Sequence, residues 1–324
     1  MFGVDLGYSS SGTLSDNVLS LITSSWSAGT KKQYKPYINK WCKYCVDHGI
    51  DPVKPPIHVA AEFLAEIFHT TKLEYSALNT IRSAMSAVIE PVNGITFGRQ
   101  PLIKRILRGV FKERPSLPKY VVTYDVDIVF RYILKQPPLS STDLKSLSFR
   151  VSTLLCILSG QRSQTLGVLD KDYMHLVDDK CIFFIRTVLK QSRPGFHQEP
   201  LDFKIYPQNE SLCPVANIRA YLEATKNLRG DQTGFFISYV PPHKTVTSST
   251  IARWVASFLR DSGINTTVFS THSTRSASSS KSLKNGLSLA DIGKAAGWSR
   301  KSTFRKSYNR PVIENFGEKV LSSF

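Results

Sequence analysis

Apolar residues recur at helical spacing through the N-terminal third of the chain, and this pattern predicts four helices. The first is expected to begin near Thr30, where Thr30 and Gln33 match a capping box, although Pro36 should break or kink it. The next three are expected over residues 58–70, 76–90 and 102–114. In the last of these, the apolar stripe predicted to pack inward is Leu102, Ile103, Ile106, Leu107, Val110 and Phe111. The pattern predicts a small all-helical bundle.

The rest of the chain alternates between helical patterns and short β-prone runs. Helices are expected over residues 126–136, 143–158, 214–228 and 249–262. Two strand-like runs, 180–190 and 200–206, flank the turn QSRPGFHQ and predict a β-hairpin, whereas 234–238 predicts a short strand or a buried turn. The expected fold class is therefore mainly α with a small antiparallel β-sheet.

Two prolines in the polar stretch 113–120 mark a linker between two domains. The expected organisation is a flexible arm at 1–25, a helical bundle at 26–114, a linker at 115–121, an α+β domain at 122–311 and a short apolar helical tail at 312–324. A length of 324 residues leaves enough chain for a hydrophobic core in each domain.

The balance of charge points to a polyanionic partner. Lys and Arg number 42 against 25 Asp and Glu, a formal net charge of +17, while a hydrophobic fraction of 41% is typical of a folded protein. Such an excess of cations favours nucleic acid, because neutralised phosphates release counterions. No apolar run reaches the length of a membrane span.

The cysteines favour a reducing compartment. Their number, five, is odd, and no secretory apolar segment is evident at the start of the chain, so a disulfide framework is not expected. Cys42, Cys45 and His48 have a metal-like spacing on one helical face, but a structural zinc would need a fourth ligand. We therefore expect plain thiols.

Candidate chemistry gathers near the C-terminus. His272 and Arg275 are three residues apart, so on a helix their side chains would converge on one group, expected to be an anion. Tyr308 lies among Arg305, Lys306 and Arg310, and these cations favour its phenolate, which makes it a candidate nucleophile. Each residue taken singly also has an ordinary structural explanation, such as a solvated helix face or a helix-end packing residue.

Upstream residues complete an ordered set. Arg162 follows the break at Ser159-Gly160, and Lys190 stands where the first strand-like run enters the hairpin turn. With His272-x-x-Arg275, Gly297-Trp298 and Tyr308, this order and spacing resemble the tyrosine recombinase (phage integrase) family. The segments KQSRPGFHQEPLDF and GWSRKSTFRKSYNRP most resemble the recombinases of DIRS- and Ngaro-type retroelements and of Cryptons.

The resemblance implies a fold and a reaction. It identifies 26–114 with the family's SAM-like core-binding domain and 122–311 with its catalytic domain. Tyr308 would attack a DNA phosphodiester and form a 3′-phosphotyrosyl link. Arg162 and Arg275 would clamp the non-bridging phosphate oxygens, and Lys190 would protonate the leaving 5′-oxygen.

Two further residues belong to the implied catalytic set. His272 would accept or orient the tyrosine proton, and Trp298 would pack the site and donate its indole N–H to a phosphate oxygen. No metal or other cofactor is implied. The chain departs from the family at Thr165, where an acidic residue is common, and in the ten positions from Trp298 to Tyr308, where nine are common.

The implied partner is double-stranded DNA, bound by a homo-oligomer, expected to be a tetramer on two DNA sites. The residues expected to contact DNA are Lys31, Lys32, Lys35, Lys40, Arg82, Lys104, Arg105, Arg108, Arg193 and Arg305. The tail at 312–324 would pack in cis or in trans. The expected location is the nucleus in a eukaryote and the cytoplasm otherwise. Two alternatives stay open: a catalytically silent DNA-binding protein derived from a mobile element, and a type IB topoisomerase-like enzyme.

Overall fold

The computed structural model of the chain describes residues 17, 20–21, 24–116, 122–189, 192, 194–195, 198–297 and 310. The chain divides into two compact units, Met1–Pro118 and Lys119–Phe324. The division falls within the segment 115–121 that the sequence marks as a linker. Most of the predicted arm and the tail at 312–324 lie outside the described residues. Within the arm, Asn17, Ser20, Leu21 and Ser24 are helical, and the flexibility of the arm stays a prediction.

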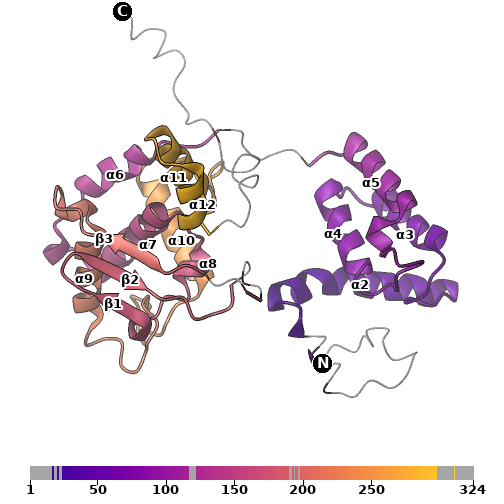
Figure 1. The fold of residues 1–324 in the computed structure, drawn as a ribbon, viewed down its shortest axis with the longest axis horizontal. Helices are drawn as coiled ribbons and strands as arrows, with labels where there is room; N and C mark the ends of the chain where they lie inside the picture. The colour runs from indigo at the N-terminus through magenta and orange to yellow at the C-terminus, as the bar shows by residue number, and fades with distance from the viewer. Residues whose placement is uncertain are drawn as a thin grey trace, which may run out of the picture. The chain divides into compact units, whose positions relative to one another are not determined.

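The first unit is a helical bundle around a main hydrophobic core, and it also contains a smaller buried cluster of Ile38, Ala84 and Val88. Its elements are α2 (Ala28–His48), α3 (Ile57–Thr70), α4 (Tyr75–Met85), the 3₁₀ helix η2 (Phe97–Arg99) and α5 (Pro101–Glu113) (Figure 1). Trp41 of α2 is fully buried against Phe63 of α3, and its indole Nε1 donates to the Pro52 carbonyl at 2.9 Å. A single large aromatic side chain thus ties α2 to both α3 and the loop before it.

The ends of two helices differ from the prediction. The N-cap of α2 is Ser27, whose Oγ accepts from Thr30 N at 3.1 Å, and the helix continues through Pro36. Helix α4 ends at Met85 rather than 90, because Ser86 Oγ is engaged by the Gly98 amide at 2.9 Å and Glu90 N donates to Val53 at 2.9 Å. Both bonds join segments that are distant in sequence.

The prediction that the whole apolar stripe of α5 packs inward is wrong for the residues at its two edges. Ile103, Leu107 and Val110 are buried, but Leu102 and Phe111 are 44% and 48% exposed. The Phe111 ring packs edge-on against Tyr75, with centroids 5.2 Å apart, outside the core. The inward face of α5 is therefore narrower than the sequence stripe.

The second unit wraps helices around α7, with a small sheet beside them. Its elements are α6 (Val126–Leu134), η3 (Leu139–Ser141), α7 (Leu144–Ser159), α8 (Ser163–Leu166), η4 (Lys171–Tyr173), β1 (Met174–Leu176), β2 (Lys180–Phe183), β3 (Leu201–Lys204), η5 (Glu210–Leu212), α9 (Pro214–Thr225), α10 (Ser248–Asp261), α11 (Ser273–Lys284) and α12 (Leu289–Ala295). Helix α7 is buried along most of its length, since α8, α9, α10 and α11 all pack against it (Figure 1).

The strands form one antiparallel sheet in the order β1-β2-β3, in which Phe183 pairs with Leu201 and Cys181 with Phe203. These four side chains are buried, whereas their neighbours along β3 are exposed, so one face of the hairpin covers the core. The predicted fold class, mainly α with a small antiparallel sheet, is confirmed.

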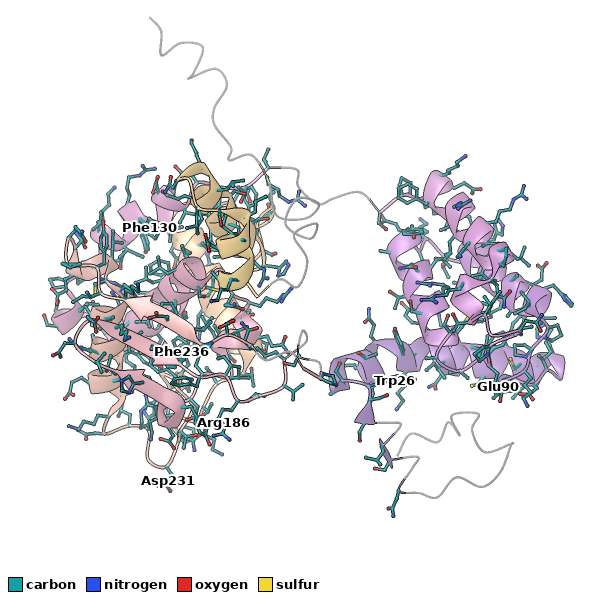
Figure 2. All side chains as sticks on the ribbon, in the orientation of Figure 1. Trp26, Glu90, Phe130, Arg186, Asp231 and Phe236 are labelled. Atoms are coloured by element: carbon teal, nitrogen blue, oxygen red, sulfur yellow. The ribbon has the colours of Figure 1, made fainter. Side chains whose placement is uncertain are left out.

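Some details of the second unit correct the prediction. Strand β2 ends at Phe183 rather than 190, and strand β1 and helix α12 were not expected as separate elements. Residues 234–238 form a buried turn with isolated bridges at Gly234 and Ile237. Phe236 of this turn lies in the interior of the unit, only 2% exposed (Figure 2).

Candidate functional site

The turn between α7 and α8 presents Arg162. Gly160 ends α7 in the left-handed region, with φ 59°, which a glycine adopts without strain. Ser159 Oγ accepts from Gln161 N at 3.2 Å and stabilises the turn, and Arg162 follows as the half-buried residue that precedes α8. A Cβ at Gly160 would lie 3.8 Å from Ala296 Cβ, so this arginine turn packs against the end of α12.

The start of α11 presents His272 and Arg275 in contrasting surroundings. His272 precedes the helix and is exposed, whereas Arg275, in the first turn, is 1% exposed. Arg275 Nη2 donates to the Ala296 carbonyl at 2.5 Å. The two arginines of the predicted set thus come from different elements, yet both elements meet the C-terminal end of α12.

A buried thiol lies beside these groups. Burial raises the pKa of Cys156, on α7, to about 12, and the nearby Arg275 guanidinium opposes that rise. Cys156 Sγ also donates to the Gln161 carbonyl at 3.6 Å. Arg275 therefore carries its charge into the protein interior next to the arginine turn, where water screens it less and its attraction for an anion is stronger than at the surface.

Two neutral residues that sequence reasoning did not assign to the site connect its parts. Gln161 Nε2 donates to the Ala295 carbonyl at 2.7 Å, and Thr165 Oγ1 donates to Gln161 Oε1 at 3.2 Å. Thr165 stands out in sequence only as a departure from the family pattern. Nothing in the sequence marks Gln161 as a site residue except its position next to Arg162.

A second candidate site is a basic groove on the first unit, between α4, η2 and α5. It has a volume of about 650 Å³ and is lined by five cations: Arg82, Arg99, Lys104, Arg108 and Lys112. No carboxylate lines it. Lys104, Arg108 and Lys112 are four residues apart on α5 and so form one ridge along the groove. An unbroken row of cations of this kind suits a phosphate backbone.

Arg82 is held in place within the groove. Its Nη2 donates to Asn79 Oδ1 at 2.8 Å and to Ser83 Oγ at 3.2 Å. A Cβ on Gly98 would lie 2.6 Å from both Cδ and Nη1 of Arg82. Gly98 is therefore the residue whose missing side chain leaves room for the guanidinium.

No protein-family model and no curated protein matches the sequence. Solved structures do match along most of the chain. The XerH site-specific recombinase bound to palindromic difH substrate, in a post-cleavage complex, aligns with a TM-score of 0.59 at 13% identity over 90% of this chain and 78% of XerH. The chain has the tyrosine recombinase fold.

Other solved recombinases match the same fold. The Tn1549 transposon integrase in complex with transposon right end DNA aligns with a TM-score of 0.52 at 12% identity, over 83% of this chain and 84% of that one. A lambda integrase dimer bound to a COC′ core site aligns with a TM-score of 0.50 at 15% identity, over 92% and 96% of the two chains. Identities this low establish the architecture alone.

Within this tyrosine recombinase fold, the structure describes three of the six predicted catalytic residues: Arg162, His272 and Arg275. Lys190, Trp298 and Tyr308 lie outside the described residues, so their roles stay predictions. Arg310 is described, and its backbone N donates to Ser280 Oγ of α11 at 3.2 Å.

The predicted DNA-contacting residues divide into three groups. Those lining the groove are Arg82, Lys104 and Arg108. Those elsewhere on the first unit are Lys31, Lys32, Lys35 and Lys40 on α2, and Arg105, which is exposed on α5. Arg193 and Arg305 lie outside the described residues. Arg99 and Lys112 also line the groove but were not among the predicted residues, although Lys112 follows Arg108 by one helical turn.

The described residues contain no cluster of three or more His, Cys, Asp and Glu side chains suited to a metal ion. Of the metal-like trio on α2, His48 Nδ1 lies 2.8 Å from the Tyr44 carbonyl, its ring stacks on Tyr44, and Cys42 and Cys45 are free thiols. Every helix in the described part of the chain is too short or too polar to cross a bilayer.

Proposed function

We propose that this chain is a site-specific DNA recombinase that cleaves and rejoins DNA through a 3′-phosphotyrosyl intermediate. The observation that carries the proposal is the approach of the arginine turn and of Arg275 to one end of α12, within a tyrosine recombinase fold. Two guanidinium groups on rigid elements can clamp one phosphate, because each offers a planar pair of donors to its oxygens.

In the proposed reaction, Tyr308 Oη attacks the scissile phosphorus and the P–O5′ bond breaks. The phenolic proton passes to His272, and Lys190 delivers a proton to the leaving 5′-oxygen. The phosphodiester bond is exchanged for a phosphotyrosyl bond of the same kind, so the reverse attack by a 5′-hydroxyl restores DNA without another energy source. Trp298 would donate its indole N–H to a phosphate oxygen.

The different exposure of His272 and Arg275 suits these roles. Proton transfer needs access to the substrate, which the exposed His272 has, while stabilising charge in the transition state benefits from a fixed, dehydrated cation such as Arg275. The reaction needs no metal ion, because guanidinium groups supply the positive charge around the phosphate.

The partner we propose is double-stranded DNA, contacted through the basic groove of the first unit and the arginines of the second. XerH and the Tn1549 integrase are described as bound to their DNA, and lambda integrase as a dimer on a core site. By analogy we propose a homo-oligomer, a tetramer when two DNA sites are joined, acting in integration or excision of a mobile element of the DIRS, Ngaro or Crypton kind. In a eukaryote it would act in the nucleus.

Two other functions use the same architecture. A catalytically silent descendant would bind DNA through the groove without forming a covalent link. A type IB topoisomerase-like enzyme would form the link but rejoin strands within one duplex, as a monomer. The presence of Arg162, Lys190, His272, Arg275 and Tyr308 in the sequence favours an active enzyme over the first.

The experiment is covalent trapping. The protein and a Tyr308→Phe variant are incubated with nicked suicide duplexes made from the termini of its own element, and SDS-stable adducts are resolved on a gel. We expect an adduct with the parent protein alone. Salt-sensitive binding without an adduct from either protein would favour the silent DNA-binding function, and relaxation of supercoiled plasmid without strand transfer between duplexes would favour the topoisomerase.

A further inference from the structure

Among the residues that the structure describes, helix α12 makes few apolar contacts that could fix its position. It spans seven residues, Leu289–Ala295, and its one fully buried large side chain, Ile292, packs in a small cluster with Leu283 and Leu289 rather than in the main core. So short a helix is not stable by itself in water. Polar contacts at its ends therefore contribute a large share of what holds it in place.

The last carbonyl groups of a helix have no partners within the helix and must be satisfied from outside. At the end of α12, Gln161 Nε2 donates to the Ala295 carbonyl at 2.7 Å and Arg275 Nη2 donates to the Ala296 carbonyl at 2.5 Å. One tether comes from the turn that carries Arg162 and the other from α11. The two proposed phosphate-binding elements are thus joined through two adjacent carbonyls.

The Ala295 carbonyl determines which way the Gln161 amide faces, and the Thr165 hydroxyl stabilises that orientation. A carbonyl can only accept, so the amide nitrogen must point to Ala295, and this leaves Oε1 toward the Thr165 hydroxyl, 3.2 Å away. Gln161 and Thr165 are 1% and 3% exposed, so water does not readily replace either bond. The reversed amide would place two acceptors against each other at Ala295.

We propose that Gln161, aligned by Thr165, is a positioning residue that holds the arginine turn, α12 and the Arg275 guanidinium in one fixed arrangement. The consequence for catalysis rests on the proposed function; the tethering of α12 does not. Without the amide bond, Arg275 is the side-chain donor that remains, among the described residues, to the carbonyls at the end of α12, and its guanidinium shifts when the helix does.

The test compares four single variants and one double variant with the parent. Gln161→Met keeps the length of the side chain without its hydrogen bonds, Thr165→Val is isosteric without the hydroxyl, and Thr165→Ser restores it. Asn217→Leu is the matched control, because Asn217 Nδ2 also makes buried bonds to backbone carbonyls, at Ser211 and Cys213, but on α9. Thermal unfolding establishes that each variant is folded.

The first readout is the rate of covalent adduct formation at saturating protein. We expect a fall on the order of 10- to 100-fold for Gln161→Met and Thr165→Val, as for a small misplacement of catalytic groups. The protein concentration that gives half-maximal DNA binding should not change in these variants. Thr165→Ser should form the adduct at nearly the rate of the parent. The double variant Gln161→Met/Thr165→Val should form it no more slowly than Gln161→Met alone. Equal losses in Asn217→Leu, or additive losses in the double variant, would overturn the proposal.

The second readout is amide hydrogen exchange across residues 289–297, which does not depend on activity. Gln161→Met should accelerate exchange in this segment, whereas Asn217→Leu should not. If the parent forms no adduct, the proposed function fails while this readout still tests the tether. Unchanged exchange in Gln161→Met would refute the tether even in a fully active enzyme.

Discussion

Removing two cations from the basic groove should change how DNA binding responds to salt. Arg108 and Lys112 are exposed on one ridge of α5, and the described residues form no ion pair with either side chain. Truncating both to alanine should therefore leave the fold nearly unchanged, with effects within about 0.5 kcal/mol expected for such surface positions. What is lost is two contacts to phosphate.

The magnitude follows from counterion release. Each phosphate contact contributes about 0.9 to the slope of log K against log salt concentration, so the slope for Arg108→Ala/Lys112→Ala should be shallower by about 1.8. Over a fourfold rise in salt, the affinity of the parent should then fall about 12-fold further than that of the variant. The assay is fluorescence anisotropy with a labelled duplex at several salt concentrations.

The control removes the same charge from another surface of the same unit. Lys54 and Lys72 are exposed and do not line the groove, so Lys54→Ala/Lys72→Ala lowers the net charge equally while leaving the ridge intact. Lys54 forms a 3.4 Å ion pair with Glu90, but an exposed pair contributes little. If both double variants change the slope by the same amount, DNA binds by overall charge and the reasoning about the groove is wrong.

Three further predictions concern single residues. Gly98→Ala should displace Arg82, because the new Cβ would lie 2.6 Å from it, and should weaken DNA binding by anisotropy more than Gly109→Ala, whose Cβ meets nothing within 4 Å. Hydrogen bonds from the Ser146 side chain, and then from the Ser146 backbone N–H, lower the pKa of Asp143. The stabilisation of the fold by the Asp143 carboxylate should therefore be complete above about pH 4 and be lost as the pH falls through the lowered pKa. Asp143→Asn should keep the cap without this pH dependence in thermal unfolding, and Asp143→Ala should lose about 1 kcal/mol. In the native protein Cys42, the half-buried thiol, should react with a thiol reagent before the buried Cys45 and Cys156, whose pKa values burial raises to about 12.

Periodicity predicted the helices well, because a helix packed on one side needs an apolar face whatever its neighbours are. Thus α3 was expected over 58–70 and spans Ile57–Thr70. Periodicity failed where contacts between distant segments determine the local structure. Helix α4 ends earlier than predicted, where Ser86 bonds to Gly98, and no periodicity indicates that Phe111 packs on Tyr75 at the edge of a groove. Local patterns carry no information on partners that only folding brings together.

The candidate site follows the same rule. The charged residues could be predicted from the sequence, because a motif consists of residue types whose side chains can perform a given chemistry. The residues that hold them were not: Gln161 and its partner Ala295 are 134 positions apart, and an alanine carbonyl has no signature in the sequence. Likewise, the role of Gly98 depends on the Arg82 side chain that lies over it.

The two proposed anion sites differ in a way that has a functional consequence. The cations of the α5 ridge are exposed, and salt at 0.1 M screens exposed charges beyond about 10 Å, so binding through the groove must be sensitive to ionic strength. Arg275 is 1% exposed and fixed by the Ala296 carbonyl, so salt barely screens its attraction for a phosphate once one is bound. Binding and the chemical step should therefore separate: rising salt should lower DNA affinity steeply, while the rate of adduct formation at saturating protein should stay nearly constant. A saturated rate that falls in parallel with affinity would mean that the phosphate is held by exposed cations rather than by the buried guanidinium.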